Sequence, residues 1–124
     1  MKGYRILPQL TEGLPAGDGL GLSVEVTVDR PLGSRHPRHP DMIYPINYGF
    51  VPGVIGGDGR PQDVYILGLD HPVERFVGRV IAVIHRNDDN EEKWVAAPEG
   101  MIFFEPEIRK AVHFTEQYFQ SSFR

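Results

Sequence analysis

The sequence predicts a mainly β protein, a small five-stranded barrel with one helix packed on it near the C-terminal end. Short apolar and β-branched segments recur along the chain, and 14 glycines and 11 prolines separate them without forming one low-complexity block. Helical periodicity is confined to the region that follows the last of these segments. The 124 residues match one domain, 1–124, of ordinary size.

The first elements are an irregular segment, a strand and a loop. Residues 1–21 are expected to be irregular, because GLPAGDGLGL is too rich in glycine for a helix. In 22–28, apolar and polar residues alternate, which predicts a half-buried strand with Glu25 on its solvent or cavity face. Residues 30–41 contain three prolines and a glycine, so a loop is expected there.

The remaining strand candidates are apolar or aromatic segments at 43–51, 64–69, 76–86 and 93–97. A turn-rich loop is expected at 51–63. The C-terminal helix is expected to carry Pro106 in its first turn and to place Ile108, Val112 and Tyr118 near one face. All these strands are expected to pair in an antiparallel barrel.

Composition excludes several classes of protein. Seventeen acidic against 13 basic side chains give a net charge of −4, which disfavours a nucleic-acid partner. Without cysteine there is no disulfide, zinc–thiolate site or thiol nucleophile. No apolar segment approaches the ~18 residues that span a bilayer, and the first residues lack the apolar core of a signal peptide. A soluble, cytoplasmic protein without a membrane partner is expected.

Two acidic segments are candidates for a metal site. Asp58 and Asp63 bracket a glycine and proline turn, which can aim both carboxylates into one cavity and so suits Mg²⁺. The second segment, 88–92, holds four acids in five residues, and these repel one another unless they are solvated or bound to metal. Each segment alone is better explained as an exposed turn. The metal interpretation depends on both segments standing at strand ends of one barrel.

The segments YPINYGFVPG (44–53) and DGRPQDVYIL (58–67) together resemble the signature of the family I soluble inorganic pyrophosphatases. The resemblance extends from residue 23 to 118, in a chain that is shorter and more diverged than the usual bacterial enzyme. It implies a five-stranded OB-like barrel, several Mg²⁺ ions in an acidic cavity, and a homo-oligomer, a hexamer in bacteria. It also implies Mg²⁺-dependent hydrolysis of inorganic pyrophosphate, with Mn²⁺ as the alternative metal.

The resemblance assigns roles residue by residue. Metal ligands are expected at Asp58, Asp63, Asp88 and Glu91. Phosphate-binding side chains are expected at Tyr48, Lys93, Tyr118 and Arg35, with Arg38 as the rival arginine. Glu25 matches an acidic residue of the cavity, and Asp63 and Arg60 occupy catalytic positions of the signature. His36 and His39 share the loop of Arg35 and Arg38, and could join a phosphate-facing cationic loop.

Arg60 is the main departure from the family pattern, because it replaces the aspartate that orients the nucleophilic water. A unit charge ~5 Å from another is worth about 3 kcal/mol at an effective dielectric constant near 20. Arg60 is therefore expected to weaken a nearby metal site, or to bind substrate phosphate in place of one cation. Ser23 and Phe119 also replace family lysines. Two functions stay open: a hydrolase, or a weakly active or non-catalytic binder of pyrophosphate or nucleotide phosphates.

Overall fold

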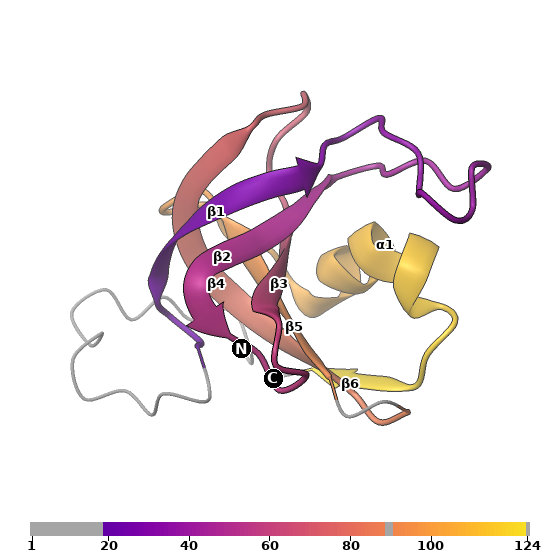
Figure 1. Cartoon of the computed structure of the whole chain (residues 1–124). Coiled ribbons are helices and arrows are strands. Elements are labelled where there is room, and N and C mark those ends of the chain that lie inside the picture. Colours follow the sequence, from indigo (N-terminus) through magenta and orange to yellow (C-terminus); the bar gives the residue numbers. More distant parts are fainter. Residues whose placement is uncertain (1–18, 89–90, 124) are drawn as a thin grey trace.

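The computed structural model describes residues 19–88 and 91–123, so most of the expected irregular segment at 1–21 lies outside the described residues. The described residues form six strands and one helix, which Figure 1 labels. In chain order they are β1 (Ser23–Arg30), β2 (Asn47–Ile55), β3 (Pro61–Ile66), β4 (Arg75–Arg86), β5 (Glu92–Ala97), α1 (Glu105–Glu116) and β6 (Ser121–Phe123). None of the helices formed by the described residues is long and apolar enough to cross a membrane.

Five of the strands close into a barrel. They are hydrogen-bonded in the order β1-β2-β3-β5-β4, and β1 also pairs with β4. This confirms the predicted five-stranded barrel. The expectation of antiparallel pairing throughout is wrong for β3 and β5, which run parallel. A closed ring with an odd number of strands cannot alternate direction at every neighbour, so at least one parallel pair is required.

The boundaries around the expected 51–63 loop were also wrong. Strand β2 extends to Ile55 and β3 begins at Pro61, so the connection shrinks to 56–60. The pairing continues past Pro52 and Gly53 because the register shifts between Val51 and Ile55, which accommodates the proline and the positive φ of Gly53. Strand β6, which pairs with the end of β4, was not expected at all.

The buried side chains form two clusters. One takes residues from all five barrel strands and includes Val26, Val64 and Trp94. The other joins β3, β4 and β5 to α1 and includes Tyr65 and Ile108. These three strands are thus buried on both faces, which explains why their sequences are apolar without alternation.

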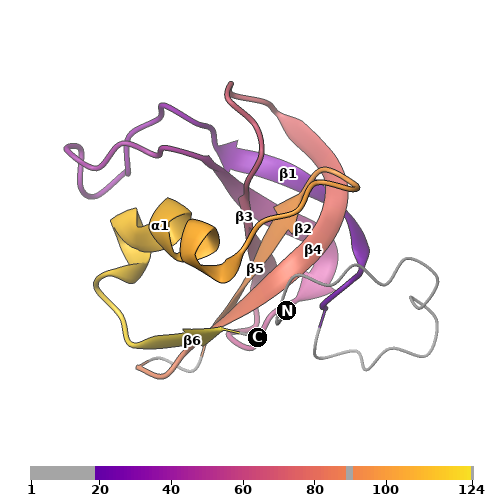
Figure 2. The ribbon, with the colours of Figure 1, turned by 180° about the vertical axis from the view of Figure 1, so that it is seen from behind.

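Helix α1 lies beside the barrel, on the side from which the loop between β1 and β2 extends (Figures 1 and 2). Pro106 stands in its first turn, and the Glu107 side chain accepts a hydrogen bond from the Phe104 N–H at 2.7 Å. Ile108 and Val112 are buried, as predicted. Tyr118 follows the end of the helix and is exposed, so its expected place on the buried face is wrong.

Candidate active site

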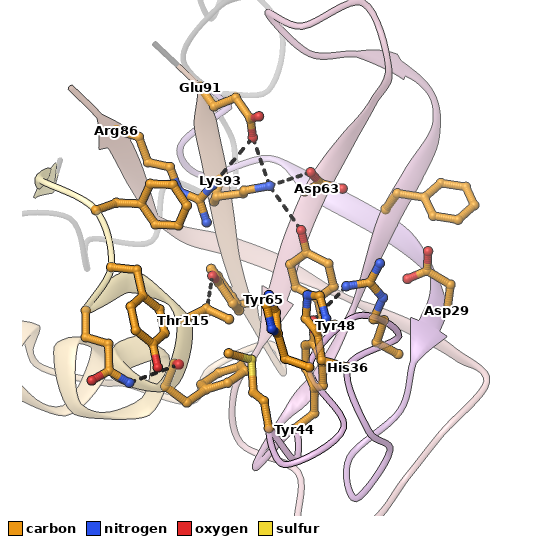
Figure 3. A pocket seen from close by; sticks show the side chains of 18 of the residues that line it. Asp29, His36, Tyr44, Tyr48, Asp63, Tyr65, Arg86, Glu91, Lys93 and Thr115 are labelled. Atoms are coloured by element: carbon orange, nitrogen blue, oxygen red, sulfur yellow. Dashed lines mark hydrogen bonds and ion pairs between the residues drawn. The ribbon is translucent and has the colours of Figure 1, made fainter. Parts of the chain in front are cut away.

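An open cavity of about 1220 Å³ lies between the β1–β2–β3 wall, the loop that follows β1, and the C-terminal end of α1. Its lining carries both signs of charge (Figure 3). The acids are Asp29, Asp41, Asp58, Asp63 and Glu91, and the permanent cations are Arg30, Arg60, Arg86 and Lys93. A cavity with this lining suits a small polyanion together with a cation.

A β-bulge at the end of β1 brings two of these side chains into the wall. Val28 pairs with Gly49 and Arg30 pairs with Tyr48, so Asp29 is an extra residue on its strand. Both Asp29 and Arg30 then line the cavity, although neighbours in a regular strand point to opposite faces. Pattern reasoning from sequence missed both, because alternation gives no sign of a bulge.

Arg30 is held against an aromatic wall. Its Nη1 donates to the Tyr44 hydroxyl at 2.8 Å, and its guanidinium carbon is 5.8 Å from the Tyr44 ring centre and 6.0 Å from that of Tyr48. Arg35, the expected phosphate arginine, instead donates to the carbonyl of Pro40 in its own loop at 2.7 Å. Neither Arg35 nor its rival Arg38 lines the cavity. Of these three arginines, Arg30 is therefore the one that lines the cavity.

Two residues of the NYGF segment, Asn47 and Gly49, stabilise the fold around the cavity. A side chain on Gly49 would collide with the backbone carbonyl of Thr27, so glycine lets β1 and β2 approach. Asn47 is buried; its Oδ1 accepts from the N–H of Leu32 at 2.9 Å, and its Nδ2 donates to the carbonyl of His71 at 3.0 Å. Asn47 thereby ties two loops to the start of β2.

The centre of the site is a buried lysine with three partners. Lys93 Nζ lies 2.6 Å from Asp63 Oδ2 and 2.9 Å from Glu91 Oε1, and it donates to the Tyr48 hydroxyl at 3.1 Å (Figure 3). Burial lowers the pKa of Lys93, but the charge of Asp63 and the hydrogen bonds to both acids outweigh it, so the net pKa is raised. Burial, and then the Asp63 charge, raise the pKa of Tyr48 well above its ordinary value.

Arg86 is a second buried cation, and sequence reasoning missed it. Its Nη2 lies 2.7 Å from Glu116 Oε2, its Nη1 lies 3.8 Å from Glu91 Oε1, and its guanidinium covers the Phe119 ring at 3.7 Å. Burial raises the pKa of Glu116, but hydrogen bonds from Arg86 and the Tyr65 hydroxyl outweigh it and lower the net pKa. The only signal in the sequence was a basic residue at the end of a long strand, just before an acidic segment.

Arg60 and Asp58 occupy the exposed turn before β3. The Asp58 Oδ1 accepts the backbone N–H of Arg60 at 3.0 Å, and Gly59 between them has a φ of +81°, which favours glycine. Both side chains line the cavity. Within 19–88 and 91–123, the Arg60 guanidinium has no hydrogen-bond or ion-pair partner.

Most of the expected site residues come together. The cavity lining includes Tyr48, Asp58, Arg60, Asp63, Glu91, Lys93 and Tyr118, and also His36 and His39. Burial, and then the nearby charge of Arg30, lower the pKa of His36, which opposes its expected role as a cation in the unliganded protein.

Besides Arg35, two expected site residues lie elsewhere. Glu25 was expected to face the cavity, but it alternates with buried Val24 and Val26, is exposed, and pairs with Arg75 at 3.6 Å. Asp88 was expected to face it too, yet its Oδ1 accepts the backbone N–H of Gln120 at 2.8 Å, outside the lining. Asp88 therefore holds the C-terminal segment against the β4–β5 connection.

The carboxylates are better placed to bind a metal ion together with substrate phosphates than to hold one by themselves. Asp58, Asp63 and Glu91 border a recess of about 10 Å³, room for roughly one water-sized body. Yet Asp63 and Glu91 are already paired with Lys93, and no three acids or histidines of the described residues are grouped to hold a metal ion. Mg²⁺ is usually bound by one or two carboxylates together with substrate phosphates. The donor set fits that arrangement.

The fold and the cavity define a class of protein, an OB-like barrel whose mixed-charge cavity suits a small phosphate-bearing ligand. The sequence profile of the inorganic pyrophosphatase family matches residues 24–118. The chain therefore belongs to the inorganic pyrophosphatase family, which is generally dependent on a divalent metal.

Individual relatives agree with this assignment. The chain is 33% identical over 81 residues to an inorganic pyrophosphatase of Aeropyrum pernix, covering 62% of this chain and 43% of that protein. It is 33% identical over 96 residues to one of Mesorhizobium japonicum, covering 64% and 54%. The chain thus matches about half the length of these curated relatives.

Solved structures show the same fold. An inorganic pyrophosphatase of Ehrlichia chaffeensis superposes with a TM-score of 0.65 at 20% identity, covering 91% of this chain and 92% of that one. The enzyme of Thermus thermophilus gives a TM-score of 0.62 at 20% identity, covering 90% and 87%. At these identities the likeness is one of architecture.

Proposed function

We propose that the chain binds inorganic pyrophosphate in the cavity and hydrolyses it to two phosphates with Mg²⁺, or with Mn²⁺ as the alternative metal. The observation that carries the proposal is the cluster of Lys93, Asp63, Glu91 and Tyr48 in a chain that belongs to the pyrophosphatase family. A phosphoanhydride needs cationic donors at its phosphates and a group that takes the proton of water. The cavity contains both kinds of group.

The phosphate-binding residues proposed here are Arg30, Arg60, Lys93, Tyr48 and Tyr118. Arg30 replaces Arg35 in this set because it lines the cavity, whereas Arg35 is bonded within its own loop. Guanidinium groups bind phosphate oxygens through paired N–H donors. Tyr118 stands exposed beside the end of α1, where its hydroxyl can reach a bound phosphate.

Asp58 and Asp63 would hold the metal together with oxygens of the substrate, and Glu91 lies beside them. A bound divalent ion neutralises phosphate charge and lowers the pKa of water. In the proposed reaction, water adds to one phosphorus and its proton passes to the Asp63 carboxylate. Protonation of Asp63 weakens its pairing with Lys93, so Lys93 can donate a hydrogen bond to the leaving phosphate. The bridging P–O bond then breaks, and the leaving phosphate takes up the proton from Asp63.

The test is phosphate release from pyrophosphate by the purified chain with Mg²⁺ and with Mn²⁺, between pH 6 and 9. We expect release well above background, and we expect Asp63→Asn to reduce kcat by about 100-fold or more. Asp70→Asn is the matched control, because Asp70 is exposed and outside the cavity. Background-level release with both metals across this range would refute hydrolysis.

The homo-oligomer, a hexamer by resemblance, and the cytoplasmic location stay predictions. Exposed apolar side chains at Ile102 and Phe104, next to the start of α1, support a contact between subunits. Size-exclusion chromatography with light scattering would measure the assembly. A monomer at micromolar concentration would contradict it.

A further inference from the structure

The cavity contains nearly as many permanent cations as acids. Its lining has four lysine and arginine side chains against five carboxylates. A cavity of carboxylates alone repels pyrophosphate until metal ions neutralise them. Here lysine and arginine side chains supply part of the neutralising charge. Which of them are paired with acids decides how many N–H donors a ligand can use.

Two of the four cations are occupied by acids. Lys93 has three N–H donors, and the structure gives each a partner in Asp63, Glu91 and the Tyr48 hydroxyl. The Arg86 guanidinium pairs with Glu116 at 2.7 Å and approaches Glu91 at 3.8 Å. Both cations are buried, so their pairing is only weakly screened by water. Before a ligand binds, Lys93 and Arg86 therefore act as internal counter-ions.

The other two cations keep donors for a ligand. The Arg60 guanidinium is exposed at the cavity and has no partner within the described part of the chain. Arg30 donates one hydrogen bond to the Tyr44 hydroxyl. Its remaining N–H groups have no hydrogen-bond partner among the described residues. Stacking against Tyr44 and Tyr48 orients Arg30 before any ligand arrives, which reduces the entropy lost on binding.

We propose that the cavity binds pyrophosphate as the metal-free anion, through Arg60 and Arg30, because Lys93 and Arg86 offset the charge of Asp63 and Glu91, the two lining acids that they contact. The inference rests on the proposed function for the identity of the ligand, and it concerns binding, not turnover. It separates two tasks of this cavity. The chain's own cations capture the anion, and the metal is needed only for hydrolysis.

The experiment is isothermal titration calorimetry of pyrophosphate into the full chain in EDTA, with hydrolysis assayed separately in Mg²⁺. We expect saturable binding in EDTA with a dissociation constant of about 100 μM or below. Arg60→Ala and Arg30→Lys are each expected to weaken binding about tenfold, the effect of one lost charge-assisted or bidentate hydrogen bond. Arg75→Ala is the matched control, because Arg75 is an exposed arginine outside the cavity.

The Lys93→Met variant separates the counter-ion role from simple anion attraction. Without Lys93, the less compensated charges of Asp63 and Glu91 should abolish binding in EDTA, whereas in the Mg²⁺ hydrolysis assay the KM for pyrophosphate should stay near the wild-type value. Arg60→Ala should raise the dissociation constant in EDTA and the KM for hydrolysis in Mg²⁺ by a similar factor. Far-ultraviolet circular dichroism of each variant checks that it is folded.

The outcomes distinguish this inference from the proposed function. No binding by the wild-type chain in EDTA, together with hydrolysis in Mg²⁺, overturns the inference and leaves the function standing. Binding in EDTA without hydrolysis in Mg²⁺ or Mn²⁺ overturns the proposed function and leaves the inference standing. Binding that Arg60→Ala and Arg30→Lys leave unchanged also overturns the inference, because it places the anion elsewhere.

Discussion

Replacing Lys93 by methionine removes a positive charge from the centre of the cavity while keeping most of the side-chain volume. In the wild-type chain the ammonium lies 2.6 Å from Asp63 and 2.9 Å from Glu91. The two carboxylate oxygens are therefore no more than 5.5 Å apart, the sum of these two distances. In the variant they face each other without a shared cation.

The cost follows from this geometry. Two like charges about 5 Å apart repel by about 3 kcal/mol at an effective dielectric constant of 20. Breaking a fully buried ion pair costs about 3–5 kcal/mol, but Asp63 and Glu91 keep 31% and 26% of their side-chain surface exposed, so water offsets part of the loss. We expect the free energy of unfolding to fall by about 2–3 kcal/mol without metal.

Mg²⁺ should recover much of this loss, because it can bind between the two carboxylates in place of the Lys93 ammonium. At 10 mM Mg²⁺ and a dissociation constant of about 1 mM, binding to the native state alone adds about 1.4 kcal/mol. Urea unfolding followed by the fluorescence of Trp94, with EDTA or with Mg²⁺, measures both quantities. Lys110→Met, at an exposed helix position, is the control and should change neither.

Two results would refute this reasoning. If Lys93→Met loses less than about 0.5 kcal/mol in EDTA, the ion pairs contribute little and the acids are already solvated. If the variant loses stability but gains no more from Mg²⁺ than the wild-type chain, the two carboxylates do not converge on a cation.

Three further predictions follow from the same contacts. Arg60→Asp should raise the affinity for Mg²⁺ about tenfold or more in calorimetric titration and abolish binding of pyrophosphate in EDTA; unchanged values would show that Arg60 points away from both ligands. Arg86 keeps the pKa of Glu116 below its ordinary 4.5, so the stability this pair contributes is present above pH 4.5 and is lost as the pH falls through the lowered folded pKa. Glu116→Gln should therefore lower stability at pH 7 by about 1–3 kcal/mol and flatten its decline in acid, measured by thermal unfolding from pH 2 to 7; an equal loss at both ends would contradict the assignment. Gly49→Ala should destabilise the chain by about 3 kcal/mol or more in urea unfolding, because the new methyl group meets the Thr27 carbonyl; a loss below about 1 kcal/mol would show that β1 and β2 can separate cheaply.

The barrel could be predicted from local patterns because each strand has its own signal in the sequence. Alternation in β1 and the apolar segments of β3, β4 and β5 are consequences of side-chain burial on one or both faces. Irregularity carries no such signal. The shift at Pro52 and Gly53 lengthened β2, and the bulge at Asp29 turned two neighbouring residues toward one cavity.

The site divides in the same way. Asp58, Arg60, Asp63, Glu91 and Lys93 were expected from the sequence to share one site, and the fold brings all of them to one cavity. The expected places of Glu25, Arg35 and Asp88 in that cavity were wrong, since a motif gives the order of residues and not the direction of a side chain. Each of the three makes a local contact instead, with Arg75, Pro40 and Gln120.

The sequence by itself determined the barrel class, the C-terminal helix and the two acidic segments, because periodicity and turn residues act over a few neighbours. Only the tertiary structure decided which charges meet. Lys93 lies between Asp63 and Glu91. Arg86 lies between Glu91 and Glu116, and Arg86 and Glu116 are 30 residues apart along the chain. Electrostatic energy depends on distance in space and on burial, and neither is written in the order of the residues.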